Sequence, residues 1–418
     1  KLIKSINKED LIITSTIDKY NCTDLNLSII LREHQKQIVE SCLKHKRGIV
    51  KSPTASGKSW AIAELIRILI KDSLKILITV PTINLLDQMA RDINEYLKLN
   101  NLEEINIGRV GDGTYTFNNI TIGIPNSLCK IEKTKEYLKS IDVLICDEAH
   151  MAANPTYSLI IEHCINRKIS LGLSATPEVV DGTDIFLEGF FGPRICTITE
   201  ADMIQKNIIL DPNFIFYTAP KAFLPNSLSS KASNISSLPD YQRYKILPQV
   251  YNYLIINNEG RNSIIINKAI EQINKNNGPI IIIVNKVNGP GNHADVLKSL
   301  LLKHKIDLPI ISGYISKKKR EIILEDLKTS KIQGVIAGPK VLTAGINIPS
   351  LSCIILAGAG KAENDFIQRV GRLLRKKEGK ERPLVIDFVD QQYWFKNQSR
   401  SRIQTASSIY GDHNIEII

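Results

Sequence analysis

Residues 52–59 read Ser-Pro-Thr-Ala-Ser-Gly-Lys-Ser; they follow a short apolar strand and open a stretch with helical spacing of apolar residues. A phosphate-binding loop that joins a strand to a helix is written G-x-x-x-x-G-K-[ST]. Gly57, Lys58 and Ser59 match it, whereas Ser52 replaces the first glycine. A chance match in a Ser/Gly turn is the alternative. The residues expected to hold a nucleotide through backbone N–H groups, an ammonium and a Mg²⁺-binding hydroxyl are Thr54, Ala55, Ser56, Gly57, Lys58 and Ser59.

Around this loop, apolar strands alternate with helical stretches. Helices are expected at residues 59–71 and 85–97, and strands at residues 48–51, 75–80, 120–124, 142–146 and 169–173. Such alternation is typical of a mostly parallel sheet that is covered on both faces. The first half of the chain is therefore predicted to be an α/β unit.

The alternation stops near residue 210 and restarts near residue 279. Residues 218–240 are rich in Ser, Pro and Asn, which indicates a connector, and residues 241–256 look helical. Later strands are expected at 279–284, 308–312, 334–337, 353–357 and 383–388, with helices at 293–303 and 318–327. The predicted organisation is an accessory segment (1–30), a first α/β domain (31–210), a connector (211–262), a second α/β domain (263–390) and a tail (391–418).

Composition limits the class of protein. The 418 residues are 43% hydrophobic and 23% charged, and no apolar run is long enough to span a bilayer. The seven cysteines are scattered without zinc-like spacing, which favours reduced thiols and a cytoplasmic location. The net charge of +11 is compatible with a polyanionic partner, although base composition of the coding DNA could also cause it.

A second motif, Asp147-Glu148-Ala149-His150, directly follows the apolar run 143–146. Sheets of this kind present catalytic groups at the carboxyl ends of strands. Asp147 is expected to hold Mg²⁺ as the acidic partner that a phosphate-binding loop requires, and Glu148 to orient or deprotonate the attacking water. The alternative, a solvated acidic turn, is disfavoured by the preceding strand and by the loop upstream.

Two further motifs complete the set. Ser174-Ala175-Thr176-Pro177 follows a predicted strand, and residues 368–375 read Gln-Arg-Val-Gly-Arg-Leu-Leu-Arg. Arg372 and Arg375 are three residues apart, which predicts a shared helix face, and two guanidiniums can stabilise charge on a transferring phosphoryl group. A basic surface helix is the alternative. Because these arginines belong to the second unit, they would reach a nucleotide only across an interdomain cleft.

In this order over residues 31–390, the four motifs resemble those of superfamily 2 helicases and translocases. The resemblance implies two RecA-like domains with ATP and Mg²⁺ between them. It implies an adenine contact by Arg32 and Gln35, and coupling roles for His150, Ser174 and Thr176. Further nucleotide contacts are implied for Gly345, Asn347 and Gln368. Nucleic-acid contacts are implied for Pro81, Thr82, Gly111, Ser127, Gly313 and Thr343.

The sequence departs from the family pattern at several positions. Ala55 replaces a frequent glycine, Ile124 a frequent threonine, Asn347 the usual acid and Leu374 the usual glycine. The arginine motif in the form Q-x-x-G-R-x-L-R is similar to that of the XPB-like and UvsW-like branch. With Asp-Glu-Ala-His, this favours DNA over RNA as the expected polymer.

Two stretches of sequence outside these motifs each allow two interpretations of their role. Lys317-Lys318-Lys319-Arg320 opens a predicted helix, where cations are disfavoured, and is either a solvated charge run or a DNA-phosphate contact. Tyr393-Trp394-Phe395, followed by Lys396, Arg400 and Arg402, either packs against the core or stacks on bases.

The sequence thus predicts an ATP-dependent DNA helicase or branch-migration translocase. It is expected to act as a monomer on single-stranded, forked or branched DNA, with replication or recombination proteins as further partners. Compact size and AT-biased composition fit a phage source, hence a host cytoplasm. The alternatives are the motor subunit of a restriction system, an RNA helicase, and an ATP-gated binding protein that neither hydrolyses nor moves.

Overall fold

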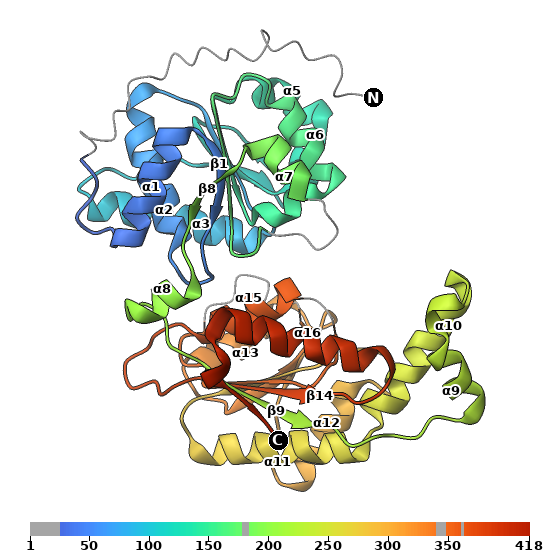
Figure 1. Ribbon diagram of the computed structural model, residues 1–418. Helices are drawn as coiled ribbons and strands as arrows, with labels where there is room; N and C mark the ends of the chain where they lie inside the picture. Colours follow the sequence, from blue (N-terminus) through green and yellow to red (C-terminus); the bar gives the residue numbers. More distant parts are fainter. Residues whose placement is uncertain (1–25, 178–183, 340–347, 361–362) are drawn as a thin grey trace. The chain divides into compact units, whose positions relative to one another are not determined.

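The computed structural model describes residues 26–177, 184–339, 348–360 and 363–418, and the chain divides into two units, Lys1–Ile198 and Thr199–Ile418 (Figure 1). Each unit is built on one largely parallel β-sheet. The α/β class expected from the alternating pattern is confirmed.

The first unit contains an eight-stranded sheet in the order β4-β3-β5-β2-β6-β7-β1-β8. Neighbouring strands run parallel, except that β3 and β4 form an antiparallel pair. β2, β5, β6 and β7 are buried along their whole length, as expected for strands covered on both faces. The strands are β1 (Arg47–Lys51), β2 (Ile76–Thr79), β3 (Gly108–Gly111), β4 (Thr114–Thr116), β5 (Ile120–Gly123), β6 (Val143–Asp147), β7 (Ile169–Ser174) and β8 (Arg194–Thr197).

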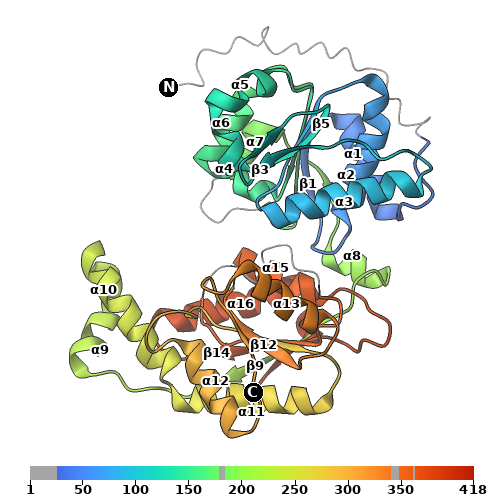
Figure 2. The same cartoon turned by 180° about the vertical axis from the view of Figure 1, so that it is seen from behind.

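Helices cover both faces of this sheet. Figures 1 and 2 show α1 (Glu33–His45), α2 (Lys58–Leu69) and α3 (Ile83–Leu99) on one face. On the other face lie α4 (Pro125–Leu128), α5 (Ile131–Lys139), α6 (Pro155–His163) and α7 (Asp184–Phe191). Leu77, Leu144 and Ile160 belong to the core cluster beneath the second group.

The second unit contains a seven-stranded sheet in the order β11-β12-β10-β13-β14-β9-β15, and its described strand pairs are all parallel. The strands are β9 (Asn213–Thr218), β10 (Ile280–Ile283), β11 (Ile310–Ile311), β12 (Gly334–Ala337), β13 (Cys353–Leu356), β14 (Leu384–Val389) and β15 (Ile415–Ile417).

The helices of the second unit also lie on both faces of its sheet. α11 (Glu259–Lys275) and α12 (His293–Lys303) cover one face, and α13 (Lys317–Lys328), α15 (Glu363–Leu373) and α16 (Tyr393–Tyr410) the other (Figures 1 and 2). The core between α11, α12 and the sheet is rich in isoleucine. The remaining helices are α8 (Glu200–Gln205), α9 (Asn226–Ser233) and α10 (Asp240–Tyr251), the last continued by a π-helical turn (Asn252–Ile256).

The structure differs from the expected connector (211–262) and tail (391–418). β9 lies within the connector, yet it pairs with β14 and β15 inside the second sheet. Its alternate residues Phe214 and Phe216 are buried, which is the pattern of a strand. The tail supplies α16 and β15, so the second unit begins at Thr199 and runs to Ile418. The Ser-, Pro- and Asn-rich stretch also contains a helix, α9.

Candidate active site

The phosphate-binding loop lies between β1 and α2, and the missing first glycine has a structural substitute. Ser52 is buried; its N–H donates to the Ser174 carbonyl at 2.9 Å, and its hydroxyl donates to Ser56 Oγ at 2.8 Å. The small serine side chain therefore fits at the buried position where the motif has glycine. Ser52 ties the start of the loop both to β7 and to the middle of the loop itself.

Two loop residues have left-handed backbone conformations. Ala55 has φ +69°, which explains why glycine is frequent at this position, because a Cβ is strained there. Gly57 has φ +81°, and a Cβ at Gly57 would lie 2.4 Å from Gln35 Nε2. Gly57 is thus favoured by its conformation, and a larger residue would also displace the Gln35 amide.

Lys58 begins α2 and folds back over the loop. Its Nζ donates to the carbonyls of Ser52 at 3.0 Å and Pro53 at 3.1 Å. The same ammonium lowers the pKa of Asp147 by its charge, which places it close to the end of β6. The lysine is therefore positioned between the loop and the acidic motif.

Asp147 ends β6 and is buried. Burial, and then the charge of Glu148, raise the pKa of Asp147 to about 7, whereas Lys58 acts in the opposite direction. Its Oδ1 accepts no hydrogen bond within the part of the chain that the structure describes. A buried carboxylate oxygen without a donor suits a bound cation, since hard divalent cations prefer oxygen ligands. The site therefore fits the Mg²⁺ expected there.

Ser59 has a partner that the sequence did not reveal. Asp92 on α3 lies near it: burial raises the pKa of Asp92, and the side chains of Ser59 and Gln88 act in the opposite direction. The sequence predicts that an acid within an amphipathic helix faces solvent. Only the packing of α3 beside α2 shows that Asp92 lies near Ser59. A second carboxylate thus lies beside the hydroxyl expected to bind Mg²⁺.

The three residues expected to couple the motifs lie together. Glu148 has φ +54°, and its Oε2 is 3.4 Å from His150 Nδ1. His150 Nδ1 is 3.0 Å from Ser174 Oγ, which also accepts from the Thr176 N–H at 3.1 Å. The carboxylate after β6 is thereby connected to the turn after β7.

The structure shows Arg32 and Gln35 engaged at the start of α1. Gln35 Oε1 accepts from the Arg32 N–H at 2.9 Å, and Gln35 Nε2 donates to the Gly57 carbonyl at 3.1 Å. The neighbouring His34, which sequence reasoning missed, has its Nε2 2.8 Å from the Ser56 carbonyl. α1 thus contacts the phosphate-binding loop directly; the adenine contact stays a prediction.

The expected nucleic-acid residues of the first unit lie at the carboxyl ends of other strands in the same sheet. Pro81 and Thr82 follow β2, Gly111 ends β3, and Ser127 lies in α4 after β5. Thr82 Oγ1 accepts from the Leu85 N–H at 3.3 Å and caps α3, and Ser127 is buried. These strands are consecutive in the order β3-β5-β2, whereas β6-β7-β1 carry the phosphate-binding motifs. The two sets occupy neighbouring halves of one edge.

In the second unit, the prediction that Arg372 and Arg375 share a helix face is wrong. Arg372 lies in the last turn of α15, but α15 ends at Leu373 and Arg375 follows it. The carbonyls at and just beyond the helix end bind groups outside α15: Leu373 O accepts from Lys380 Nζ, and Leu374 O from the Leu210 N–H. Gln368 lies inside α15.

Gly313 follows β11 and is exposed. Lys317 opens α13 as expected, Lys318 and Lys319 are exposed, and Arg320 donates to the Ser312 carbonyl at 3.2 Å. The remaining expected residues of this unit lie outside the described ranges: Thr343, Gly345 and Asn347.

The aromatic run at the start of α16 packs against the protein, as the first of its two interpretations states. Phe395 is buried, with its ring 6.1 Å from that of Tyr251, and Tyr393 Oη is 2.9 Å from Ser229 Oγ. Arg402 is buried and pairs with Asp387 at 2.7 Å. Phe395 and Arg402 are therefore not available to stack on bases.

Two family models match the chain. Residues 28–179 match the type III restriction enzyme res subunit family, and residues 263–377 match the helicase conserved C-terminal domain. The chain is a superfamily 2 helicase. ATP-dependent helicases and translocases make up this superfamily. Within the described ranges, no helix of this helicase has the length and apolar character of a membrane span.

Relatives support this assignment along most of the helicase. It is 28% identical to a protein of Sulfolobus islandicus filamentous virus that carries a helicase name, over 87% of this chain but only 64% of that protein. It is 25% identical to the DNA 3'-5' translocase XPB2 of Sulfurisphaera tokodaii, over 92% of this chain and 87% of the relative. It is also 25% identical to the ATP-dependent DNA helicase uvsW of Enterobacteria phage T4, over 85% of this chain and 68% of the relative.

Solved structures share the fold. The Saccharomyces cerevisiae protein Dbp5, bound to RNA, aligns with a TM-score of 0.61 at 16% identity, over 91% of this chain and 89% of that one. The Hef helicase domain of Pyrococcus furiosus aligns with a TM-score of 0.58 at 14% identity, over 90% and 98%. The expected pair of RecA-like domains is confirmed.

Proposed function

We propose that this helicase is a DNA motor that unwinds or branch-migrates forked and junction DNA, using Mg²⁺ and ATP. The observation that carries the proposal is the division of one sheet edge. Phosphate-binding motifs follow β6, β7 and β1, and the candidate nucleic-acid segments follow the adjacent β3, β5 and β2. A conformational change at the nucleotide would therefore have to pass through only one or two strands to reach the residues that contact the polymer.

In this proposal, Lys58 binds the outer phosphates while Ser59 and Asp147 hold the cation. Glu148, held at a left-handed backbone position beside His150, orients the attacking water. Bound Mg²⁺ supplies charge stabilisation to the transferring phosphoryl group. Arg372 and Arg375 of the second unit are proposed to add to that stabilisation. Gln35 and Arg32 contact the adenine.

The polymer is proposed to bind chiefly through its phosphates. Backbone contacts carry no sequence information, so binding should be largely sequence-independent and should weaken as salt rises, by a log–log slope of about −0.7 per phosphate on single strands. The net charge of +11 agrees with this. DNA is favoured because two relatives that align along most of the chain are named as a DNA translocase and a DNA helicase.

The choice of polymer is tested by ATP turnover on matched substrates. Turnover and strand separation are measured with single-stranded, forked, four-way-junction and fully duplex DNA, and with RNA of the same sequences. We expect the greatest stimulation and unwinding with forked or junction DNA. Stimulation by RNA and not by DNA would overturn the DNA proposal and leave the ATP-dependent motor intact.

One observation favours a second candidate, the motor of a restriction system: residues 28–179 match a restriction-subunit family model. In that case the chain would move along duplex DNA without separating its strands, and a partner would supply the nuclease. A triplex-displacement assay on linear duplex distinguishes the two. Displacement without fork unwinding would support the restriction motor.

A further inference from the structure

Lys380 lies in the turn after α15 and reaches back to the end of that helix. Its Nζ donates to the carbonyl of Leu373 at 2.6 Å and to the carbonyl of Arg375 at 3.0 Å. Carbonyls at a helix C-terminus lack intrahelical donors, and a cation there is favoured by the helix dipole. One ammonium therefore joins the last residue of α15 to the residue that carries the second arginine of the motif.

The backbone of this segment is held from outside at three successive positions. Between the two carbonyls that Lys380 binds, the Leu374 carbonyl accepts from the Leu210 N–H at 2.9 Å. The Leu210 contact is made by backbone and survives any substitution except proline. Lys380 provides the other two contacts through a side chain, so it is the part of this arrangement that a substitution can remove.

We propose that Lys380 is a positioning residue for the arginine motif: it fixes the backbone of Leu373–Arg375 and so sets where Arg372 and Arg375 present their guanidiniums. The inference rests on the proposed role of these arginines in hydrolysis. A displacement of about 1 Å in a group that stabilises a transition state can cost roughly 10²-fold in rate. Lys380 touches no reacting atom in this account and acts only through the helix end.

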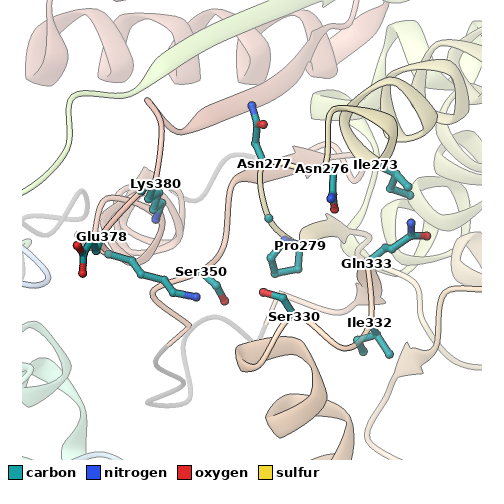
Figure 3. A pocket seen from close by; sticks show the side chains of 13 residues that line it. Ile273, Asn276, Asn277, Pro279, Ser330, Ile332, Gln333, Ser350, Glu378 and Lys380 are labelled. Carbon is teal, nitrogen blue, oxygen red and sulfur yellow. The ribbon is translucent and has the colours of Figure 1, made fainter.

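The surroundings of Lys380 make its charge sensitive to pH. It lines a polar pocket of about 380 Å³ at the amino ends of strands of the second sheet, the edge at which α15 ends (Figure 3). The charged groups around Lys380 include Lys377 and Glu378 in the same turn, Arg375, and Glu381, whose carboxylate accepts from Asn277 of the pocket lining. The residues that line the pocket from other elements are uncharged: Ile273, Asn276, Asn277, Gly278, Pro279, Ser330, Ile332, Gln333 and Ser350.

Burial, with the charges of Arg375 and Lys377, lowers the pKa of Lys380 to about 8. Near neutral pH the ammonium is charged, and charge-assisted hydrogen bonds are roughly twice as strong as neutral ones. Above pH 8 the Lys380 ammonium loses its proton, and its hydrogen bonds to the two carbonyls become weaker. An arginine at this position would keep its charge throughout this range.

The test compares Lys380→Met, Lys380→Arg and the control Lys377→Met, which removes an exposed cation from the same turn. DNA-stimulated ATP turnover, DNA affinity and the thermal unfolding midpoint are measured for each full-length variant, with pH profiles from 7 to 9.5. We expect Lys380→Met to lower kcat by about 10- to 100-fold with DNA affinity within two-fold of wild type. Lys377→Met should keep the wild-type kcat at pH 7.5, and because it removes a charge that lowers the pKa of Lys380, its fall in rate should move to higher pH.

The pH profiles separate positioning from general stability. Wild-type kcat should fall above pH 8. Lys380→Arg should have at least half of the wild-type kcat at pH 7.5, and its kcat should not fall above pH 8. If Lys380→Met fails to fold, wild type and Lys380→Arg still decide the matter. Identical pH profiles in these two proteins, or a folded Lys380→Met with wild-type kcat, would overturn the inference. Absence of turnover in wild type would instead contradict the proposed function itself.

Discussion

His150 Nδ1 lies 3.0 Å from Ser174 Oγ, so the acidic motif after β6 and the Ser-Ala-Thr-Pro turn after β7 are joined by one hydrogen bond. Glu148 Oε2 lies 3.4 Å from the same ring nitrogen, so the carboxylate and the serine hydroxyl meet at one edge of the imidazole. The carboxylate proposed to orient water is thus linked through His150 to the turn after β7, and the Ser174 carbonyl of that turn also accepts from the Ser52 N–H of the phosphate-binding loop at 2.9 Å. We infer that this link transmits the state of the nucleotide.

Replacing Ser174 by alanine should uncouple hydrolysis from movement. The change removes the acceptor of the Thr176 N–H as well as the His150 contact, while the proposed catalytic groups stay in place. We expect DNA-stimulated ATP turnover within about 5-fold of wild type and unwinding reduced by more than 10-fold, since two lost hydrogen bonds of about 1 kcal/mol each cost about 2 kcal/mol, which is roughly 30-fold. Both rates are measured on one forked substrate.

Ser170→Ala is the matched control for that experiment. Ser170 lies on the same strand, is equally buried, and its hydroxyl donates to the Phe190 carbonyl at 3.2 Å, away from the motifs. Ser170→Ala should lower the free energy of unfolding but leave the ratio of unwinding to ATP hydrolysis at the wild-type value. Equal unwinding-to-hydrolysis ratios in the two variants would show that the His150–Ser174 bond is structural only.

The strained alanine of the phosphate-binding loop gives a stability prediction. Because Ala55 has φ +69°, glycine at this position removes a strain of about 1–2 kcal/mol and adds about 0.5–1 kcal/mol of unfolded-state entropy. Ala55→Gly should therefore leave the free energy of unfolding unchanged or raise it by up to about 1.5 kcal/mol. Ala90→Gly, inside α3, should lower it by about 1 kcal/mol. Denaturant unfolding measures both, and equal destabilisation would refute the assigned conformation.

His293 predicts how the second unit responds to acid. Burial, and then the charge of Arg261, lower the pKa of His293 to about 3, against about 6.5 in the unfolded chain. Between these values the unfolded chain binds the extra proton, so the stability that neutral His293 contributes is full above pH 6.5 and is lost as pH falls. The calculated loss between pH 7 and pH 5 is about 2 kcal/mol.

His293→Gln tests that relation by unfolding at both pH values. Glutamine does not titrate, so the variant should lose about 2 kcal/mol less than wild type over this interval. His304→Gln, just after α12, serves as the non-buried comparison. The same pH dependence in wild type and His293→Gln would contradict the buried neutral state.

The sequence predicted the elements whose signals are local. The loop at Gly57-Lys58-Ser59 and the acid after 143–146 each follow an apolar strand, so their positions at the sheet edge were predictable from order alone. β9 and β15 were not predictable in this way. β9 is flanked by turn-rich sequence, and β15 has three residues, too few for a period of two to be seen.

The site details that the sequence missed depend on residues far apart in the chain. Gln35 meets Gly57, Ser59 meets Asp92, and Ser52 meets Ser174 only after the sheet has formed. The shared helix face of Arg372 and Arg375 failed as a prediction for the same reason: Lys380 and Leu210, which hold the carbonyls beyond α15, give no signal within the motif.

The central claim is that the phosphate-binding loop and the acidic motif hydrolyse ATP to drive movement on DNA. The most direct test is steady-state ATP turnover, with and without forked DNA, in wild type, Glu148→Gln and Glu162→Gln, an exposed acid on α6. We predict DNA-stimulated turnover in wild type and Glu162→Gln, and a loss of about 10²–10⁴-fold in Glu148→Gln with ATP binding retained. Turnover in Glu148→Gln at the wild-type rate, or wild-type turnover that DNA leaves unchanged, would contradict the account.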